Sequence, residues 1–215
     1  MITHHPADSL LLKHAAGAAH EAVSLIVATH LALCPACRRV VKLAEHAGGI
    51  LLENLTPEPL TTGAWEHLAA RLDEAEAAAP SIVARSGGTP TIPEPLRSYL
   101  GADGLDKIRW NFVLPGLAFR PLLPGPFSAK LVRSKPGSSI GLHSHKGEEF
   151  SVVLAGGYSD CSGQYRRGDF HTATPDLLHR PVADQGEDCI VLAVTEAPLA
   201  FRNPPIGLIA SLIGY

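Results

Sequence analysis

Hydrophobic residues in the first third of the chain recur every three or four positions, which is the spacing of one face of an α-helix. Proline is tolerated in the first turn of a helix and glycine favours its end, so both residues mark boundaries. The pattern predicts four short helices: one capped by Asp8, one over residues 20–33, one from Pro35 to Gly48–Gly49, and one carrying Trp65, Leu68 and Leu72. Four such helices bury only a small core, so their stability calls for a further constraint such as a bound metal.

A different pattern takes over after residue 96. Residues 76–95 are rich in Ala, Pro, Gly and Ser, and prolines such as Pro93 and Pro95 are expected to oppose any regular element there. Short strand-like runs separated by Gly and Pro turns follow, among them Ala129–Val132, Phe150–Leu154 and Cys189–Val194. The sequence predicts an α+β chain with two domains: a small four-helix domain over 1–79, a linker over 80–96 and an all-β domain over 97–215.

The charge of the chain argues against two kinds of partner. Residues 1–85 carry six Lys/Arg and nine Asp/Glu, and residues 86–215 carry twelve of each, so neither part has the basic surplus that nucleic-acid binding needs. The apolar stretch Ala22–Leu33 is far shorter than the roughly 20 residues that span a bilayer. No export signal is evident at the start, so we expect a cytoplasmic chain without a membrane or nucleic-acid partner. The acidic first part suits a basic protein partner.

His30, Cys34 and Cys37 place one imidazole and two thiols within eight residues. In a reducing compartment, cysteines so closely spaced favour metal binding over a disulfide. A redox-active pair would be expected beside a βαβ pattern, which this segment lacks. Two thiolates and an imidazole suit zinc, whose tetrahedral structural sites need a fourth ligand. For that ligand we choose His5, with His4, His14 and His20 as alternatives.

A second group of metal-binding residues lies in the β half, where the chain reads Gly-x5-His143-x-His145-x3-Glu149-x6-Gly. Alternate residues of a strand point to the same face, so His143 and His145 can face one ion, and Glu149 can join them. This is the first motif of the cupin family. The later segment Gly-Asp-x5-Pro-x3-His179 resembles the second cupin motif in weakened form, which implies that His179 is the fourth ligand.

Other residues of the β half receive simpler interpretations. We expect Cys161 and Cys189 to be small buried side chains, since a reactive thiol must be exposed and have a lowered pKa. His171 is expected at the surface or beside the metal ligands without binding the ion itself. Glu148 should point away from the pocket, because it precedes Glu149 in an extended strand.

The order of the two groups resembles one family. The pattern His-x3-Cys-x2-Cys joins two short helices and follows a histidine 25 residues upstream, which resembles the zinc-binding anti-sigma domain. With a cupin-like domain after it, the chain resembles the ChrR family over nearly its whole length. The resemblance implies a zinc site and a second divalent metal site, also for zinc, with these ligands: His5, His30, Cys34 and Cys37 in the first, and His143, His145, Glu149 and His179 in the second.

The same resemblance implies a regulator of transcription that is not an enzyme. The helical domain would hold an extracytoplasmic-function sigma factor in a 1:1 complex, and the cupin-like domain would govern its release on an oxidative signal, singlet oxygen or an organic hydroperoxide. The alternative is a metal-dependent cupin enzyme, a dioxygenase or an isomerase, with the helical zinc domain for docking, because fold and metal do not fix function. The weakened second motif and the lack of an acid or base beside the ligands argue against that alternative.

Overall fold

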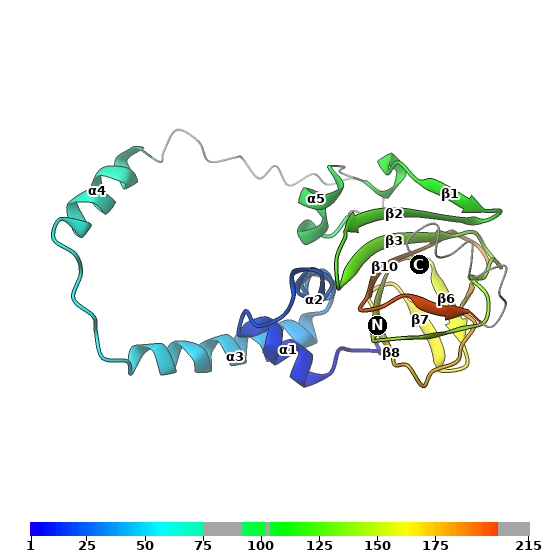
Figure 1. Cartoon of the computed structure of the whole chain (residues 1–215), viewed down its shortest axis with the longest axis horizontal. Coiled ribbons are helices and arrows are strands. Elements are labelled where there is room, and N and C mark those ends of the chain that lie inside the picture. The colour runs from blue at the N-terminus through cyan, green and yellow to red at the C-terminus, as the bar shows by residue number, and fades with distance from the viewer. Residues whose placement is uncertain (75–91, 102–103, 202–215) are drawn as a thin grey trace. The chain divides into compact units, whose positions relative to one another are not determined.

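Helices come first along the chain and strands second (Figure 1). The computed structural model describes residues 1–74, 92–101 and 104–201 of the chain. The α+β class and the order of its two parts are confirmed. Within the described residues, every helix is too short or too polar to cross a lipid bilayer.

The helices are α1 (Asp8–Ala15), α2 (Glu21–Leu33), α3 (Pro35–Glu53), α4 (Ala64–Glu74) and α5 (Glu94–Leu100), followed by the short 3-10 helix η2 (Leu105–Lys107). The ring of His20 caps α2 by accepting a hydrogen bond from the backbone N–H of Ala22 at 3.3 Å. Helix α3 begins at Pro35 as predicted, because the missing N–H of proline costs nothing in a first turn. Its predicted end at Gly48–Gly49 is wrong. The helix continues to Glu53, since an interior glycine costs only about 1 kcal/mol.

Helix α5 begins inside the predicted linker 80–96, of which residues 80–91 lie outside the described part. Pro93 occupies the N-cap position and Pro95 the first turn, where neither proline removes a helical hydrogen bond. Ile92 and Leu96 are fully buried. The expectation that these prolines oppose regular structure is therefore wrong, because the first turn of a helix accepts proline.

The described strands form an antiparallel, cupin-like arrangement of three sheets in the orders β1-β2-β3-β10-β5-β8, β7-β6-β9 and β11-β4. Alternating apolar runs with Gly and Pro turns produce strands at the places predicted. Their bounds are β1 (Asn111–Leu114), β2 (Leu117–Leu123), β3 (Ser128–Ser134), β4 (His143–His145), β5 (Glu149–Ala155), β6 (Gly157–Asp160), β7 (Gly163–Arg166), β8 (Phe170–Ala173), β9 (Val182–Ala183), β10 (Cys189–Thr195) and β11 (Leu199–Phe201).

The chain divides into two compact units, one of residues 1–46 with 89–215 and one of residues 47–88. In the first unit, α2 packs against α1, α5 and the strands β5 and β10. Its buried residues Ile26 and Val27 share one hydrophobic core with Val152 and Leu192 of these strands. Helix α2, predicted to belong to a separate helical domain, thus packs against the strands.

The second unit has a different character. None of residues 47–72 is buried, and eight large apolar side chains of this stretch are exposed. They are Ile50, Leu51, Leu52, Leu55, Leu60, Trp65, Leu68 and Leu72. The described part of this unit therefore has no hydrophobic core of its own.

We predict that Leu96→Ala destabilises the chain by about 2–5 kcal/mol, because it leaves a cavity at a fully buried position of the core shared by helices and strands. Leu60→Ala is the matched control. Its side chain is 80% exposed, so the free energy of unfolding should change by less than about 0.5 kcal/mol. Denaturant unfolding measures both values, and equal effects would contradict this account of the core.

Candidate metal centres

The break between α2 and α3 builds the first cluster. His30 lies in the last turn of α2, Cys34 is its C-cap in an extended conformation, and Cys37 lies in the first turn of α3. His5 joins them from the segment before α1. One ligand atom of each residue lies within 4.8 Å of the others. The structure thus brings together the four residues predicted for the N-terminal zinc site.

The distances in this cluster fit a zinc ion. The Nδ1 atom of His5 lies 3.3 Å from the Cys37 Sγ and 3.5 Å from the Cys34 Sγ, and the Nε2 atom of His30 lies 3.3 Å from the Cys37 Sγ. Nitrogen and sulfur ligands of tetrahedral zinc are about 3.5 Å apart, given bonds of about 2.0 and 2.3 Å. The other ring nitrogen of His30, Nδ1, is 2.8 Å from the carbonyl oxygen of Gly168, so Nδ1 donates and Nε2 faces the thiols.

The three alternative histidines lie elsewhere. The His4 ring contacts that of Tyr165 at a centroid distance of 4.5 Å and a tilt of 43°, and its Nδ1 is 3.7 Å from the Asp169 carboxylate. His20 caps α2. His14 lies in the last turn of α1, and its Nδ1 is buried without a hydrogen bond in the described structure. Of the four candidates, only His5 reaches the cysteines.

Burial sets the protonation of this cluster. It lowers the pKa of His30 to about 4, so the imidazole is neutral near pH 7, as a metal ligand must be. It also raises the pKa of Cys37 to about 12, with further contributions from Cys34 and Asp8. A thiol of this pKa keeps its proton near pH 7 unless a metal ion displaces it. Metal binding here therefore releases protons and strengthens as the pH rises.

The second cluster lies in the β domain, where β4 carries His143 and His145. A pair of backbone hydrogen bonds, of 3.0 and 2.9 Å, joins His143 to His179 and brings the third ring alongside. The Nε2 atom of His179 is 3.0 Å from that of His145 and 3.1 Å from that of His143. All three histidines are buried. The structure thus gathers three of the four residues predicted for this site.

These three rings also fit a metal ion. Nitrogen ligands at about 2.0–2.1 Å from a common ion are roughly 2.9–3.4 Å apart, which matches the observed separations. His143 directs its Nδ1 to the Gly141 carbonyl oxygen at 2.9 Å, so its Nε2 faces the other rings. Burial lowers the pKa of His143 to about 4 and of His145 to about 3, which leaves unprotonated nitrogens converging on one point. A cation bound between the three rings would give these ring nitrogens a partner.

Glu149 is not among the converging ligand atoms. Its Oε2 lies 3.8 Å from the Nδ1 of His145, and its Oε1 accepts a hydrogen bond of 3.5 Å from Ser151. Burial raises the pKa of Glu149, and the Lys130 ammonium opposes that rise. Its role as a ligand stays a prediction.

Sequence reasoning missed Lys130. This residue of β3 is buried, and burial lowers its pKa to about 8 although the charge of Glu149 acts to raise it. Lys130 precedes Val132 and Ser134 at two-residue spacing, and both line the interior cavity. Because alternate residues of a strand point to the same face, the two-residue spacing of Lys130 from Val132 could have shown that its side chain faces the interior.

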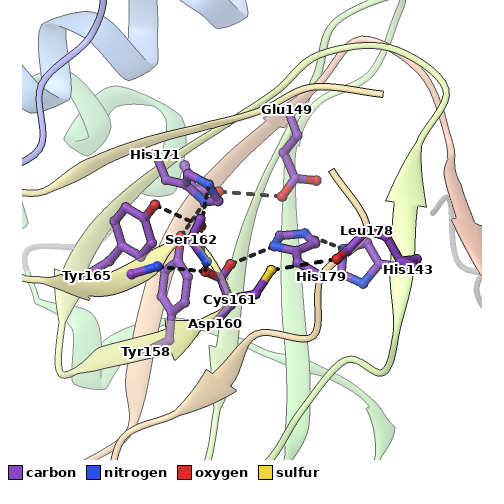
Figure 2. Close-up of polar contacts among 12 residues, drawn as sticks. His143, Glu149, Tyr158, Asp160, Cys161, Ser162, Tyr165, His171, Leu178 and His179 are labelled. Atoms are coloured by element: carbon purple, nitrogen blue, oxygen red, sulfur yellow. Dashed lines mark hydrogen bonds and ion pairs between the residues drawn. The ribbon is translucent and has the colours of Figure 1, made fainter. Parts of the chain in front are cut away.

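A network of polar side chains supports His179 from behind (Figure 2). The Nδ1–H of His179 donates to Asp160 Oδ2 at 2.6 Å, and Asp160 Oδ1 accepts from the N–H and hydroxyl of Ser162. Burial alone would raise the pKa of Asp160, but these hydrogen bonds hold it well below its usual range. A separation of 2.6 Å is too short for two ligands of one ion, so Asp160 orients His179 rather than binding the metal beside it.

One of the simpler interpretations is narrowed and another is wrong. Of the two positions expected for His171, the structure shows the one beside the histidine cluster: the residue is buried, its ring lies 5.8 Å from that of His179, and its Nδ1 makes a 3.0 Å hydrogen bond with the Tyr158 hydroxyl. Cys161 is exposed, because it lies in the tight turn between β6 and β7. Cys189 is buried as expected, and burial raises its pKa to about 12. The neighbouring interior cavity has a volume of about 50 Å³ and is lined by Glu149, His179 and Cys189 among others.

Comparison with known proteins decides the family. A family model described as the ChrR Cupin-like domain matches residues 104–199. A protein of Cereibacter sphaeroides named Anti-sigma-E factor ChrR is 38% identical over 204 residues, which cover 94% of this chain and 93% of the relative. The chain belongs to the ChrR family. The resemblance found in the sequence is thereby confirmed.

A solved structure agrees with this membership of the ChrR family. The ChrR chain in the crystal structure of Rhodobacter sphaeroides SigE in complex with the anti-sigma ChrR is 36% identical to this one. The match has a TM-score of 0.79 and covers 91% of this chain and all of that one. A protein from Ralstonia eutropha with a cupin-like fold matches 46% of this chain at 14% identity, with a TM-score of 0.40.

We predict that Asp160→Asn weakens metal binding at the histidine cluster by about 10–100-fold, because one amide oxygen cannot accept from both His179 and the Ser162 turn. Asp188→Asn is the control, since Asp188 pairs with Arg133 and touches none of the three histidines. Competition with a chromophoric chelator measures the affinity. An unchanged affinity in Asp160→Asn would show that Asp160 does not orient a metal ligand.

Proposed function

We propose that this chain is an anti-sigma factor, which binds one extracytoplasmic-function sigma factor and releases it on an oxidative signal, singlet oxygen or an organic hydroperoxide. One observation carries the proposal: the chain is alike over nine tenths of its length to a ChrR chain crystallised with a sigma factor. Sequestration needs a surface and no chemistry, so the proposed function is not enzymatic.

The exposed apolar side chains of residues 50–72 supply the contact surface. A soluble chain rarely exposes many large apolar side chains together unless they meet a partner. Here Leu51, Leu60, Trp65 and Leu72 are each more than half exposed, on a stretch with no buried residue. The acidic surplus of residues 1–85 favours a partner with a basic face.

The metals have different roles in this proposal. Two thiolates and two imidazoles close the coordination of zinc, so the N-terminal ion is structural and fixes the junction of α2 and α3. Three imidazoles leave room at the second ion, which we take to be zinc as well, for a small ligand. The helical part, residues 1–79, binds the sigma factor, and the cupin-like part governs its release in response to the oxidative signal.

The size of the interior cavity supports sensing over catalysis on an organic substrate. Its volume is about 50 Å³, whereas pockets for drug-sized ligands have roughly 300–1,000 Å³. Such a space holds a few water molecules or a small oxidant. The alternative of a cupin dioxygenase or isomerase would therefore need more space beside the histidine cluster than this cavity offers.

We predict that Trp65→Ala weakens binding of the cognate sigma factor by at least 30-fold, since a large aromatic side chain at an interface commonly contributes about 2 kcal/mol or more. Phe112→Ala is the matched control, because Phe112 is 79% exposed but lies on β1 of the cupin-like part. Titration calorimetry with purified sigma measures both affinities. Equal losses in the two variants would place the contact surface elsewhere.

We predict that His143→Ala retains inhibition but loses the response to singlet oxygen or an organic hydroperoxide, because it removes one imidazole from the histidine cluster and leaves all four residues of the first cluster in place. Ser144→Ala is the control, since residue 144 faces the opposite side of β4. A sigma-dependent reporter is read with and without each oxidant. A normal response from His143→Ala protein without metal in its β domain would remove that metal from the mechanism.

A further inference from the structure

The segment from Gly168 to His171, where β8 begins, contacts both metal clusters. Its first residues hold His30 and the chain that leads to His5, and its last residue packs beside His179. The two clusters are far apart in sequence but share this one stretch of four residues.

The first contact is with His30. The Gly168 carbonyl accepts the His30 Nδ1–H at 2.8 Å, and the Phe170 ring lies edge-on to the His30 ring at a centroid distance of 5.7 Å. Together they fix which nitrogen of His30 faces the thiols and how its ring is turned. Imidazole ligands held in this way bind metal more tightly than free ones.

The second contact is a clasp around the N-terminal segment. The carboxylate of Asp169, only 2% exposed, accepts the backbone N–H groups of Thr3 at 2.7 Å and His4 at 3.0 Å, and its other oxygen accepts that of Arg166 at 2.8 Å. The Phe170 N–H donates to the His4 carbonyl at 3.0 Å. Since His5 is the next residue, these hydrogen bonds to Thr3 and His4 fix the position of a proposed metal ligand.

Gly168 allows this close approach. Its φ of +93° is strained for any residue with a side chain, and a Cβ there would lie 2.5 Å from the Ile2 Cδ1. The N-terminal segment therefore lies directly on the backbone at the start of β8.

The other end of the segment reaches the histidine cluster. The ring of Tyr165 stacks on that of His171 at a centroid distance of 4.3 Å and contacts that of His4 at 4.5 Å. One ring therefore contacts a neighbour of each cluster. Its hydroxyl is 3.0 Å from that of Ser162, which donates to Asp160, the partner of His179. Hydrogen bonds and ring contacts thus run without a gap from His179 to the residue before His5.

We infer that metal binding at the two clusters is coupled through Asp169 and Tyr165, so that losing the metal of the histidine cluster loosens the hold of the first cluster on its zinc. The inference rests on the proposed metal occupancy of both clusters. Each ion holds the start of β8 in the arrangement that the other needs, and such coupling is reciprocal. Through this coupling, a change in the cupin-like part would affect the α2–α3 junction. Helix α3 continues from that junction into the proposed sigma-binding surface.

The test follows metal release from the first cluster in the full chain loaded with Co²⁺. Only thiolate ligands give the near-ultraviolet charge-transfer band, so a double variant with Cys34→Ser and Cys37→Ser, which removes both thiols of the first cluster, should abolish the band and identifies the signal. Asp169→Asn should speed the loss of this band to a chelator by about 10–100-fold. Asp184→Asn, the same change at a carboxylate bonded to Ser159 and Gln164, should behave as the wild type.

Coupling is measured by adding His179→Ala. In the wild-type background it should speed the loss of the thiolate band about fivefold or more, and in the Asp169→Asn background it should add nothing. His4→Ala guards against misfolding of Asp169→Asn, because the His4 side chain is 37% exposed and its loss leaves the backbone clasp in place. It should reduce the effect of His179→Ala without unfolding the chain.

Two outcomes would overturn the inference: no effect of His179→Ala on the band, or equal effects in both backgrounds. The proposed sigma binding is scored separately, by copurification of sigma with the same variants. A wild-type chain without a thiolate band would overturn the first metal site and the coupling together.

Discussion

The hydrogen bond between the His30 imidazole and the Gly168 carbonyl joins the two halves of this chain at a residue of the first cluster. It is buried, and it links residues 138 positions apart. Because it fixes the ring of His30, the geometry of the first cluster depends on where β8 begins. Helix α2 therefore belongs structurally to the strands on which it packs, although the sequence places it among the helices.

The two clusters differ in what their ligands permit. Thiolates and imidazoles that close around an ion leave no position for a further ligand, which suits a fixed structural role. Three imidazoles beside a small cavity leave an open side, and the charged forms of the nearby Lys130 and Glu149 favour each other. The proposed function thus gives the chain one site that holds its fold and another that responds.

Residues 47–72 illustrate a different principle. A stretch without a buried side chain gains little stability by itself, and its exposed leucines and Trp65 remain available for another surface. In an anti-sigma factor this arrangement is useful, since the energy of burying those side chains is released on binding. The first unit, with its shared core, provides the stable part of the chain.

The sequence by itself determined the features that depend on neighbouring residues. Helical spacing and Pro35 predicted α2 and the start of α3, His-x3-Cys-x2-Cys predicted that three residues of one cluster lie together, and the alternation of His143 and His145 predicted the same for two residues of the other. These predictions held because the periods of a helix and a strand act over a few residues.

Only the tertiary structure decided the rest. It selected His5 among the upstream histidines, set Glu149 apart from the converging rings, and placed Asp160 behind His179. It also showed that α2 packs against β5 and β10. Each of these depends on contacts between segments far apart along the chain, which leave no periodic trace in the sequence, because the packing that selects them exists only once the strands and helices have come together.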